Sequence, residues 1–523
     1  MKLVTLDAII PRDDFETLEE ASNNTRNKTT ISIEDLKNDS FFFLNLRKPD
    51  FQRETNDWSP QKIVGLVESF LKGDLVPAII LWKNKNGLIF VIDGSHRLSS
   101  LCAWINDDYG DKDISAKYFD NYIPEEQKKI AEDTRTLMKE KVGLFSDYYK
   151  QTGQTHDSKN SNINLYLKNL GSISIQVQWV EGDSDRAEQS FLKINQSASP
   201  ILPAELELIQ SRHTPQSIAA RAIYRAGKGH NYWSMFSENT QKLIKDYAEK
   251  IHLFLFKTGT VSKSDLSSFA MAGLLSSGDS LGIILQTIKI SNALKDNLEY
   301  VENKTIDERI IIKYMKNTLK LLEVINSNQK GSLGLHPYVY FYSSNGKHKI
   351  GSYYGFLLLV KELNEQNKFP EFIRAREKIE LILVKYHFLV QQIIRKNRST
   401  SNSYVNVANW YRLLINEIIS NENEEIDNIV KKCIQNNQNF SYLNLAITDN
   451  EDNSTRKDFS RGQKNIIKMQ TLFDTLPKCK ICNGYVDMNS ASIDHIKRKA
   501  DGGEANFNNG QVTHIYCNMS IKK

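Results

Sequence analysis

The strongest constraint on the fold of this chain lies in its last 45 residues, where two short ligand pairs are spaced for a metal ion. The first pair is Cys479-x-x-Cys482, and the second is His514-x-x-Cys517 near the C-terminus. Two separated pairs of thiol and imidazole ligands with two-residue gaps are typical of a closed tetrahedral zinc site. A segment this short cannot bury a sufficient hydrophobic core alone, so the pattern predicts a module that zinc holds together.

Polar residues between and beside these pairs indicate chemistry as well as structure. They are Asp494, His495, Gly502, Gly503, Asn506, Asn509 and Asn518. A purely structural zinc knuckle needs none of them, although solvated polar loops are the simple alternative. A histidine suits the deprotonation of water near neutral pH. Oxygen ligands suit a hard cation that stabilises charge on a phosphodiester.

In this order the residues resemble the motif of HNH nucleases, C-x-x-C, D-H-I, G-G, N, N, then C-x-x-C-N-x-x-x-K. That family has a ββα-metal fold, a short hairpin followed by a helix. The resemblance implies that His495 is the general base and that Asn509 holds the histidine loop in place. It also implies that Asp494 and Asn518 bind one catalytic Mg²⁺ or Mn²⁺.

One position departs from the family pattern, because His514 stands where a cysteine is usual. Zinc accepts three cysteines and one histidine as readily as four cysteines, so the predicted zinc ligands are Cys479, Cys482, His514 and Cys517. The alternative makes His514 a ligand of the catalytic metal. It lies four residues before Asn518, a spacing that would put both side chains on one helical face.

A second candidate site lies near the N-terminus, after two predicted strands. Ser59-Pro60 predicts a helix start and Gly73 its end, and strands are expected at 76–82 and 88–92 around an Asn86-Gly87 turn. Directly afterwards comes Asp93-Gly94-Ser95-His96-Arg97, which opens another helix. A glycine, a helix N-terminus and an arginine together suit phosphate binding. The alternative is a tight turn in which Asp93 pairs with Arg97.

Further motifs in the same region resemble the DGQQR-motif domain, a ParB-like fold of prokaryotic defence proteins. They are Phe51-Gln52-Arg53, Trp58, the step from Gly73 to Pro77, and Phe191, Asn195 and Leu202, and the resemblance spans residues 40–210. It implies a nucleoside triphosphate pocket lined by Gln52, Arg53, Asp93, Gly94, Ser95, His96, Arg97 and Asn195. Some family members hydrolyse the nucleotide. The sequence D-G-S-H-R departs from the family motif at the third and fourth positions. This departure weakens the expectation of nucleotide hydrolysis more than that of phosphate binding by Gly94 and Arg97.

The chain of 523 residues is long enough for several domains, and we expect an α+β multidomain protein. The predicted domains are a ParB-like nucleotide-binding domain at 1–210, a helical domain at 211–447, a linker at 448–465 and an HNH domain at 466–523. The first 40 or so residues are expected to be peripheral. A tyrosine-rich stretch at 337–354 is interpreted as core aromatics rather than as a platform for nucleic-acid bases.

The distribution of charge and the spacing of the cysteines limit which partners and which cellular compartment are expected for this protein. The net charge is +5, and residues 456–523 carry 12 Lys and Arg against 6 Asp and Glu. The positive excess therefore lies with the nuclease-like segment, as binding to a phosphate backbone requires. Metal-spaced thiols, the lack of a signal-peptide pattern and the lack of long apolar runs predict a reduced, cytoplasmic protein.

A DGQQR-type domain, a helical middle and a C-terminal HNH domain together resemble modification-dependent or otherwise phage-sensing restriction proteins. The resemblance implies a restriction endonuclease that defends against phage by cutting DNA at the HNH domain, with nucleotide binding at the N-terminal domain as the gate. The expected cofactors are zinc, Mg²⁺ or Mn²⁺ and a nucleoside triphosphate, and the expected partner is phage or modified DNA. One alternative is a non-enzymatic ParB-like DNA-binding regulator with a structural zinc module. Another is a toxin that cleaves RNA.

Overall fold

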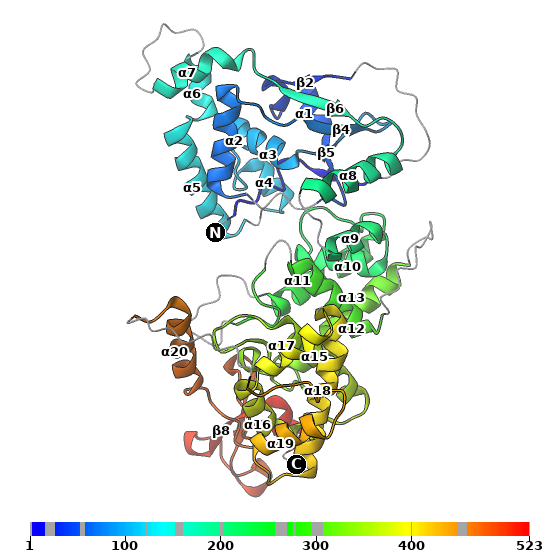
Figure 1. The fold of residues 1–523 in the computed structure, drawn as a ribbon, viewed down its shortest axis with the longest axis vertical. Coiled ribbons are helices and arrows are strands. Elements are labelled where there is room, and N and C mark those ends of the chain that lie inside the picture. Colours follow the sequence, from blue (N-terminus) through cyan, green and yellow to red (C-terminus); the bar gives the residue numbers. More distant parts are fainter. Residues whose placement is uncertain are drawn as a thin grey trace. The chain divides into compact units, whose positions relative to one another are not determined.

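The computed structural model describes residues 3–15, 27–52, 58–121, 123–151, 161–198, 203–256, 269–275, 279–294, 307–398, 400–446 and 458–521. The chain divides into two compact units (Figure 1). The first unit comprises residues 1–212 and 228–235, and the second comprises 213–227 and 236–523. The predicted helical and HNH domains therefore share one compact unit. Within the described residues, no helix is both long and apolar enough to cross a membrane.

A six-stranded mixed sheet organises the first unit. Its order is β1 (Arg12–Asp13), β3 (Leu46–Pro49), β5 (Ile89–Asp93), β4 (Ile79–Lys83), β6 (Ile175–Trp179) and β2 (Thr30–Ile31). Strands β4 and β5 form an antiparallel hairpin whose turn contains Gly87 at φ +83°, and β3 runs parallel to β5. The strands predicted at 76–82 and 88–92 are confirmed as β4 and β5, each shifted slightly along the chain.

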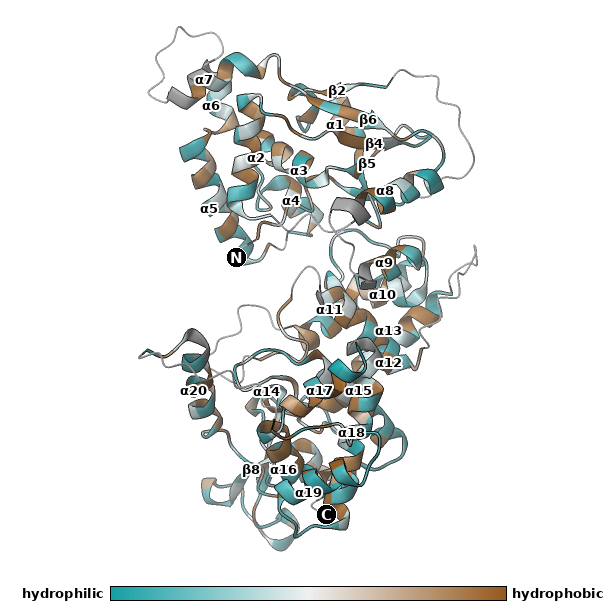
Figure 2. Ribbon diagram, in the orientation of Figure 1, coloured by the Kyte–Doolittle hydropathy of each residue, from teal (hydrophilic) through white to brown (hydrophobic). Residues whose placement is uncertain are grey.

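Alternating side chains of β4 and β5 are buried on both faces of this sheet. Hydrophobic residues colour much of these two strands brown (Figure 2). On one face Leu81 and Val91 pack in the core that includes α2 (Pro60–Lys72), α3 (Ser95–Asn106) and α5 (Glu125–Lys141). On the other face Trp82 and Phe90 pack in a smaller cluster with Phe191 of α8 (Ser184–Ala198). The shorter elements of this unit are η1 (Glu34–Leu36), α1 (Phe41–Asn45), α4 (Asp113–Tyr118), α6 (Phe145–Gln151), α7 (Ser161–Leu170) and α9 (Pro203–Gln210).

Helix α2 begins and ends where the sequence predicted. The Ser59 hydroxyl accepts a hydrogen bond from the Lys62 backbone N–H at 3.4 Å, and Pro60 occupies the first turn. Gly73 ends the helix at φ +79°, in the left-handed region that a glycine adopts without strain.

The expectation that the first 40 residues are peripheral is wrong. Val4, Leu6, Ile9 and Ile10 are almost fully buried in the larger core of the first unit. Strands β1 and β2 also pair with β3 and β6 at the two edges of the sheet. The physical reason is that short apolar runs fill a core without showing the longer periodicity by which an element is recognised in a sequence.

The second unit is mostly helical, as the periodicity of residues 204–445 predicted. Its helices are α10 (Pro215–Tyr224), α11 (Glu238–Leu255), α12 (Asp279–Asn292), α13 (Glu308–Ile325), α14 (Pro337–Phe341), α15 (Ile350–Glu365), α16 (Phe369–Lys385), α17 (Phe388–Lys396), α18 (Thr400–Ser420), α19 (Ile426–Gln435) and α20 (Arg461–Phe473). The predicted linker at 448–465 lies largely outside the described residues. Its last part is wrong, because Ser460 caps α20 with a capping box and the helix begins at Arg461.

The tyrosine-rich stretch is part of this helical core. Tyr340 and Tyr353 are fully buried, and Phe356 stacks on Tyr411 with ring centroids 4.2 Å apart. Buried rings cannot receive nucleic-acid bases, so the interpretation as core aromatics is confirmed. The same stretch buries Lys349 directly before α15.

The burial of Lys349 generates a prediction about pH. Desolvation lowers the pKa of Lys349 to about 7, whereas a lysine in the unfolded chain keeps its ordinary value of 10.5. Between these values the unfolded chain binds more protons, so the stability of the second unit rises with pH across this window. Replacing Lys349 with Met removes the burial cost and should stabilise this unit by on the order of several kcal/mol near pH 7.

Urea unfolding at about pH 7 and about pH 9.5 measures this effect, with the exposed Lys347→Met as the matched control. The gain from Lys349→Met should shrink at the higher pH. That pH lies close to the pKa of 10.5 in the unfolded chain, so protonation of the amine favours unfolding much less than it does near pH 7. A gain of equal size at both pH values would contradict the prediction.

Candidate functional site

The structure brings the four predicted zinc ligands together in the second unit. The ligand atoms of Cys479, Cys482, His514 and Cys517 all lie within 4.8 Å of one another. Cys479 and Cys482 flank a tight turn in which the Cys479 N–H donates to the Gly484 carbonyl at 2.8 Å. His514 ends strand β8 (Gly510–His514), and Cys517 begins the helical turn η6 (Cys517–Ile521).

Hydrogen bonds orient the His514 ring toward the cysteines. Its Nδ1 lies 3.3 Å from the Cys482 Sγ, while its Nε2 lies 2.9 Å from the Tyr485 carbonyl oxygen. A ring whose Nε2–H donates to a carbonyl leaves Nδ1 as the metal-binding atom. Hydrogen bonds from Cys482 and Cys517 lower the pKa of the Cys479 thiol, and the same contacts raise the pKa of the other two thiols. Three thiols and one imidazole at these distances fit a structural zinc ion.

The alternative role of His514, as a ligand of a catalytic metal, depended on its sharing a helical face with Asn518. That premise is wrong. His514 lies on a strand, and the helical turn that carries Asn518 begins after it. Both ring nitrogens of His514 face other groups, the cysteine sulfurs on one side and the Tyr485 carbonyl on the other.

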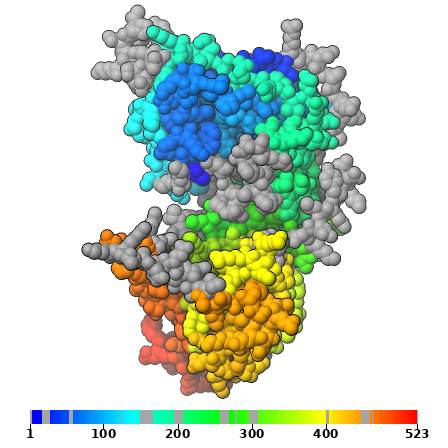
Figure 3. Space-filling model, viewed as in Figure 1, coloured from blue at the N-terminus to red at the C-terminus, as the bar shows by residue number. Residues whose placement is uncertain are grey.

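A buried ion pair of α16 holds these four ligands, the predicted zinc cluster, against the helices of their own unit. Figure 3 shows the C-terminal residues, in red, beside helices of the same unit. Arg376 is fully buried and donates to Glu380 at 2.7 Å and to the Leu333 and Gly334 carbonyls at 2.6 and 3.0 Å. Glu380 in turn accepts the Tyr340 hydroxyl and the Tyr485 backbone N–H, each at 2.6 Å. The cysteine turn is therefore bonded directly to a helix of the same unit.

Next to the zinc cluster, a two-stranded hairpin carries the predicted catalytic residues. Strand β7 (Ala491–His495) pairs antiparallel with β8, and the register places Asp494 opposite Gln511. Gln511 Nε2 donates to Asp494 Oδ2 at 2.7 Å, and the Asp494 side chain is buried. The acid is therefore held in one orientation by its cross-strand neighbour.

Asn518 reaches the same face of the hairpin as Asp494. Alternation along β7 projects Ser492 and Asp494 from one side, and Asn518 Nδ2 donates to the Ser492 hydroxyl at 2.8 Å. Since Nδ2 is the donor, the amide oxygen of Asn518 is turned away from Ser492. The structure thus puts one carboxylate and one amide on a single face, and these are oxygen donors of the kind that Mg²⁺ and Mn²⁺ prefer.

Asn509 braces the loop that follows His495. Its Oδ1 accepts the Lys497 N–H at 2.7 Å, and its Nδ2 donates to the Lys497 and Glu504 carbonyls at 3.1 and 2.8 Å. Close packing requires Gly503 here, because an added Cβ would lie 1.9 Å from the Lys497 carbonyl oxygen. The polar residues between the ligand pairs therefore build one closed loop.

His495 itself is the last residue of β7 and pairs with Gly510. Its side chain is half-buried, and its Nε2 atom is buried although its cross-strand neighbour is a glycine. The side chains of Asp494 and His495 leave the strand on opposite faces, as neighbours on a strand do. Lys497, Arg498 and Lys499 follow at once and are exposed. The end of β7 therefore leads from a histidine directly into three exposed cations.

In the first unit, the predicted phosphate-binding residues gather where β5 meets α3. Gly94 caps α3 at φ +96°, and the Arg97 Nη2 donates to Asp93 at 2.8 Å and to the Ala78 carbonyl at 3.2 Å. The Asp93–Arg97 ion pair is the contact that the simple turn interpretation expects. Arg53 lies outside the described residues, and so does the side chain of Asn195.

The other members of this set occupy the same neighbourhood. Gln52 is buried and donates to the Val91 carbonyl at 3.1 Å, while its Oε1 meets no hydrogen-bond donor among the described residues. His96 stacks on Trp58 with ring centroids 5.5 Å apart, and Ser95 is buried in the first turn of α3. A buried amide oxygen with no donor is costly, which is consistent with a ligand that supplies one.

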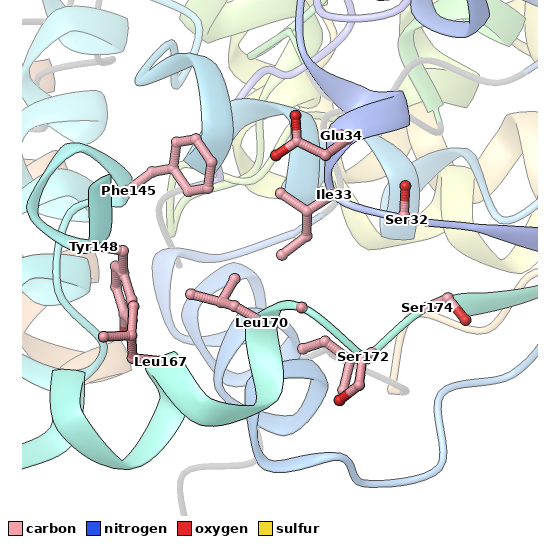
Figure 4. Close-up of a pocket in the computed structure, with 11 residues that line it drawn as sticks. Ser32, Ile33, Glu34, Phe145, Tyr148, Leu167, Leu170, Ser172 and Ser174 are labelled. Carbon is pink, nitrogen blue, oxygen red and sulfur yellow. The ribbon is translucent and has the colours of Figure 1, made fainter. Parts of the chain in front are cut away.

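A cavity of about 500 Å³ lies elsewhere in the first unit (Figure 4). Its wall is apolar, with Phe145, Tyr148, Leu167 and Leu170, and serines line its rim. The Tyr148 hydroxyl donates a hydrogen bond to the Val142 carbonyl at 2.6 Å. None of the predicted nucleotide-binding residues lines this cavity.

Residues 33–213 match the family model described as GmrSD restriction endonuclease, N-terminal domain. The match covers the region, residues 40–210, whose motifs resemble the DGQQR-motif domain of prokaryotic defence proteins, and it supports a restriction-type protein. The chain matches no curated protein and no solved structure.

Two site residues escaped prediction from the sequence. Gln511 orients Asp494, and the Tyr485 carbonyl orients His514. In the sequence, nothing but its position near the start of β8 distinguishes Gln511. That position points to a contact with Asp494 only when the register of the two strands is known. A backbone carbonyl leaves no signal at all in a sequence.

The zinc cluster generates a prediction about stability. Cys482→Ser removes one ligand and should reduce bound zinc from about one ion per chain to far less, because tetrahedral affinity depends on every thiolate. Hydrogen exchange should then rise across residues 478–521. Because Tyr485 is bonded to Glu380, it should also rise at the end of α16.

Elemental analysis and hydrogen-exchange mass spectrometry measure these effects. Cys433→Ser, at a buried cysteine of α19 that lies outside the cluster, is the matched control. A zinc-free wild type that stays folded and active would refute the structural role.

Proposed function

We propose that this protein is a restriction endonuclease that hydrolyses DNA phosphodiester bonds at the hairpin of residues 491–514. The observation that carries the proposal is that Asp494 and Asn518 share one hairpin face, while His495 is the next residue of the same strand, at its end. The family match of residues 33–213 supports the restriction role. The resemblance of the C-terminal motif to HNH nucleases supports hydrolysis there.

In the proposed reaction, His495 takes a proton from the attacking water, and the phosphate lies along the basic loop after it. Lys497, Arg498 and Lys499 hold the DNA backbone. Asp494 and Asn518 hold a divalent cation, which when bound neutralises charge on the scissile phosphate. Gln511 keeps the Asp494 carboxylate oriented, and Asn509 keeps the loop after His495 closed. The zinc cluster takes no part in the chemistry and anchors the hairpin.

For the first unit, we propose that a nucleoside triphosphate binds at the start of α3. The first turn of α3 offers backbone N–H groups, and Gly94 precedes it, with the Ile79 and Arg97 side chains close to its Cα. The buried Oε1 of Gln52 is available to a donor on the ligand. Arg97 would then exchange its contact with Asp93 for one with a phosphate, and this exchange couples occupancy to the DNA-cutting module.

The His495 proposal is tested by activity. His495→Ala should lower the rate of DNA cleavage by roughly 10²- to 10⁴-fold, the usual contribution of a general base, without loss of zinc or of DNA affinity. Asn518→Ala should also lower the rate, and high Mn²⁺ should partly restore it, because a metal ligand is missing. No such rescue is expected for His495→Ala.

Plasmid DNA, phage DNA and RNA are incubated with each variant and Mg²⁺, and His387→Ala, at another half-buried histidine, is the matched control. Near wild-type cutting by His495→Ala would remove this residue from the mechanism. Cleavage of RNA alone would replace DNA as the substrate.

The nucleotide site is tested by calorimetry. Arg97→Ala should weaken triphosphate binding roughly 10- to 150-fold, the effect of one charge-assisted contact. Arg97→Lys keeps a charge near Asp93 but loses the two-pronged geometry, so it should bind with intermediate affinity. If Arg97→Ala only lowers the melting temperature and leaves affinity unchanged, the Asp93–Arg97 pair is structural.

A further inference from the structure

The loop between the two hairpin strands exposes an aromatic side chain completely. Phe507 has a relative exposure of 103%, and its ring therefore packs against none of the described residues. It opens the short turn η5 (Phe507–Asn509). A fully solvated phenyl ring gains no stability from burial within the described residues, so its apolar surface is available to a binding partner.

Hydrogen bonds fix the backbone of the loop that carries this ring. Asn506 Oδ1 accepts the Asn509 N–H at 3.0 Å, and the Gly510 N–H donates to the Phe507 carbonyl. Asn509 is in turn bonded to Lys497 on both its N–H and its carbonyl. The backbone that carries Phe507 is thus fastened to the segment that follows the candidate base His495.

Two further apolar side chains extend the exposed surface. Ile493 and Ile496 are 65% and 57% exposed. A Cβ built on Gly510 would lie 3.4 Å from the Ile493 Cγ2 and 3.8 Å from the Phe507 carbonyl oxygen, so Ile493 lies next to the backbone of Phe507. We call Ile493, Ile496 and Phe507 the apolar ridge.

Charge beside the ridge indicates what covers it. Lys497, Arg498 and Lys499 are exposed on the same loop, and Asn509 joins Lys497 to the turn that carries Phe507. An apolar tip flanked by cations is complementary to duplex DNA, which offers phosphates outside and stacked bases inside. Proteins that deform DNA insert such apolar side chains between base pairs and recover the unstacking cost through closer backbone contact.

We propose that Phe507 is a wedge that enters a base step of duplex DNA next to the bond being cut, while Lys497 and Lys499 hold the flanking phosphates. This inference rests on the proposed function and adds how the DNA is deformed at the site. The wedge opens the stack and turns the backbone toward His495. Cleavage should therefore favour base steps that unstack easily, such as pyrimidine–purine steps.

The wedge is tested with full-length protein on the phage or plasmid DNA that the wild type cuts. Phe507→Ala should lower cleavage efficiency roughly 5- to 150-fold, the value of one stacked aromatic contact. Phe507→Trp should retain activity, because indole also stacks. Phe41→Ala is the matched control, since Phe41 of α1 is 88% exposed and lies in the other unit.

A mismatched base pair at the cut site provides the decisive test, because a mismatch lowers the free energy needed to unstack the bases there. The mismatch should restore most of the activity of Phe507→Ala and change the wild type little. Permanganate, which oxidises unstacked thymines, should detect an opened step with the wild type in Ca²⁺ and none with Phe507→Ala. If Phe507→Ala cuts intact duplex at the wild-type rate, the wedge is refuted.

Two outcomes separate this inference from its alternatives. If the wild type itself cuts no DNA, the proposed function fails and the wedge fails with it. If the wild type is an oligomer that Phe507→Ala dissociates, and the mismatch restores nothing, the apolar ridge contacts a second copy of the chain and the wedge is overturned. Zinc content equal to that of the wild type verifies that each variant is folded.

Discussion

The buried pair of Arg376 and Glu380 is the interaction on which the C-terminal site depends. Both side chains are almost completely buried, and each bonds to groups outside its own helix. Removal of one partner from such a pair typically costs about 3–5 kcal/mol, because the other charge is left buried and uncompensated. Here the uncompensated group would face the turn between Cys479 and Tyr485. A substitution of Arg376 or Glu380 would therefore be expected to displace the turn that carries Cys479 and Cys482.

Two glycines show how closely the helices and the zinc module fit. A Cβ on Gly484 would lie 2.7 Å from the Arg376 Nε, and a Cβ on Gly334 would lie 3.2 Å from the His514 Cδ2. Gly334 also has φ +59°, where a side chain is strained. The module has few apolar residues of its own to bury. Its position is specified by polar contacts and close backbone approach, which tolerate less substitution than an apolar interface does.

The sequence predicted the local features of this site better than the contacts that support it. The spacing of Cys479 and Cys482 and of His514 and Cys517 indicates a metal because the ligands are close along the chain. The capping residue Ser59 and the stop at Gly73 are local for the same reason. Arg376 carries no such signal: an arginine between apolar residues of a helix usually lies on a solvated face. Its burial becomes visible only when Leu333, Gly334 and Glu380 are brought around it in space. The burial of Val4 to Ile10 was missed because short edge elements lack a long period.

A series of successive contacts, rather than a large hydrophobic core, holds the residues of the candidate site in place. Arg376 and Glu380 fix the cysteine turn, and the ligand cluster fixes His514 at the end of β8. The strand register then places Gln511 against Asp494, and Asn509 closes the loop after His495. A displacement of about 1 Å at a reacting group can cost 10²-fold in rate, so each of these supports matters for catalysis. The reactive residues can therefore lie on an exposed hairpin, open to a polymer as large as DNA, while their positions are held by groups buried in the helical core.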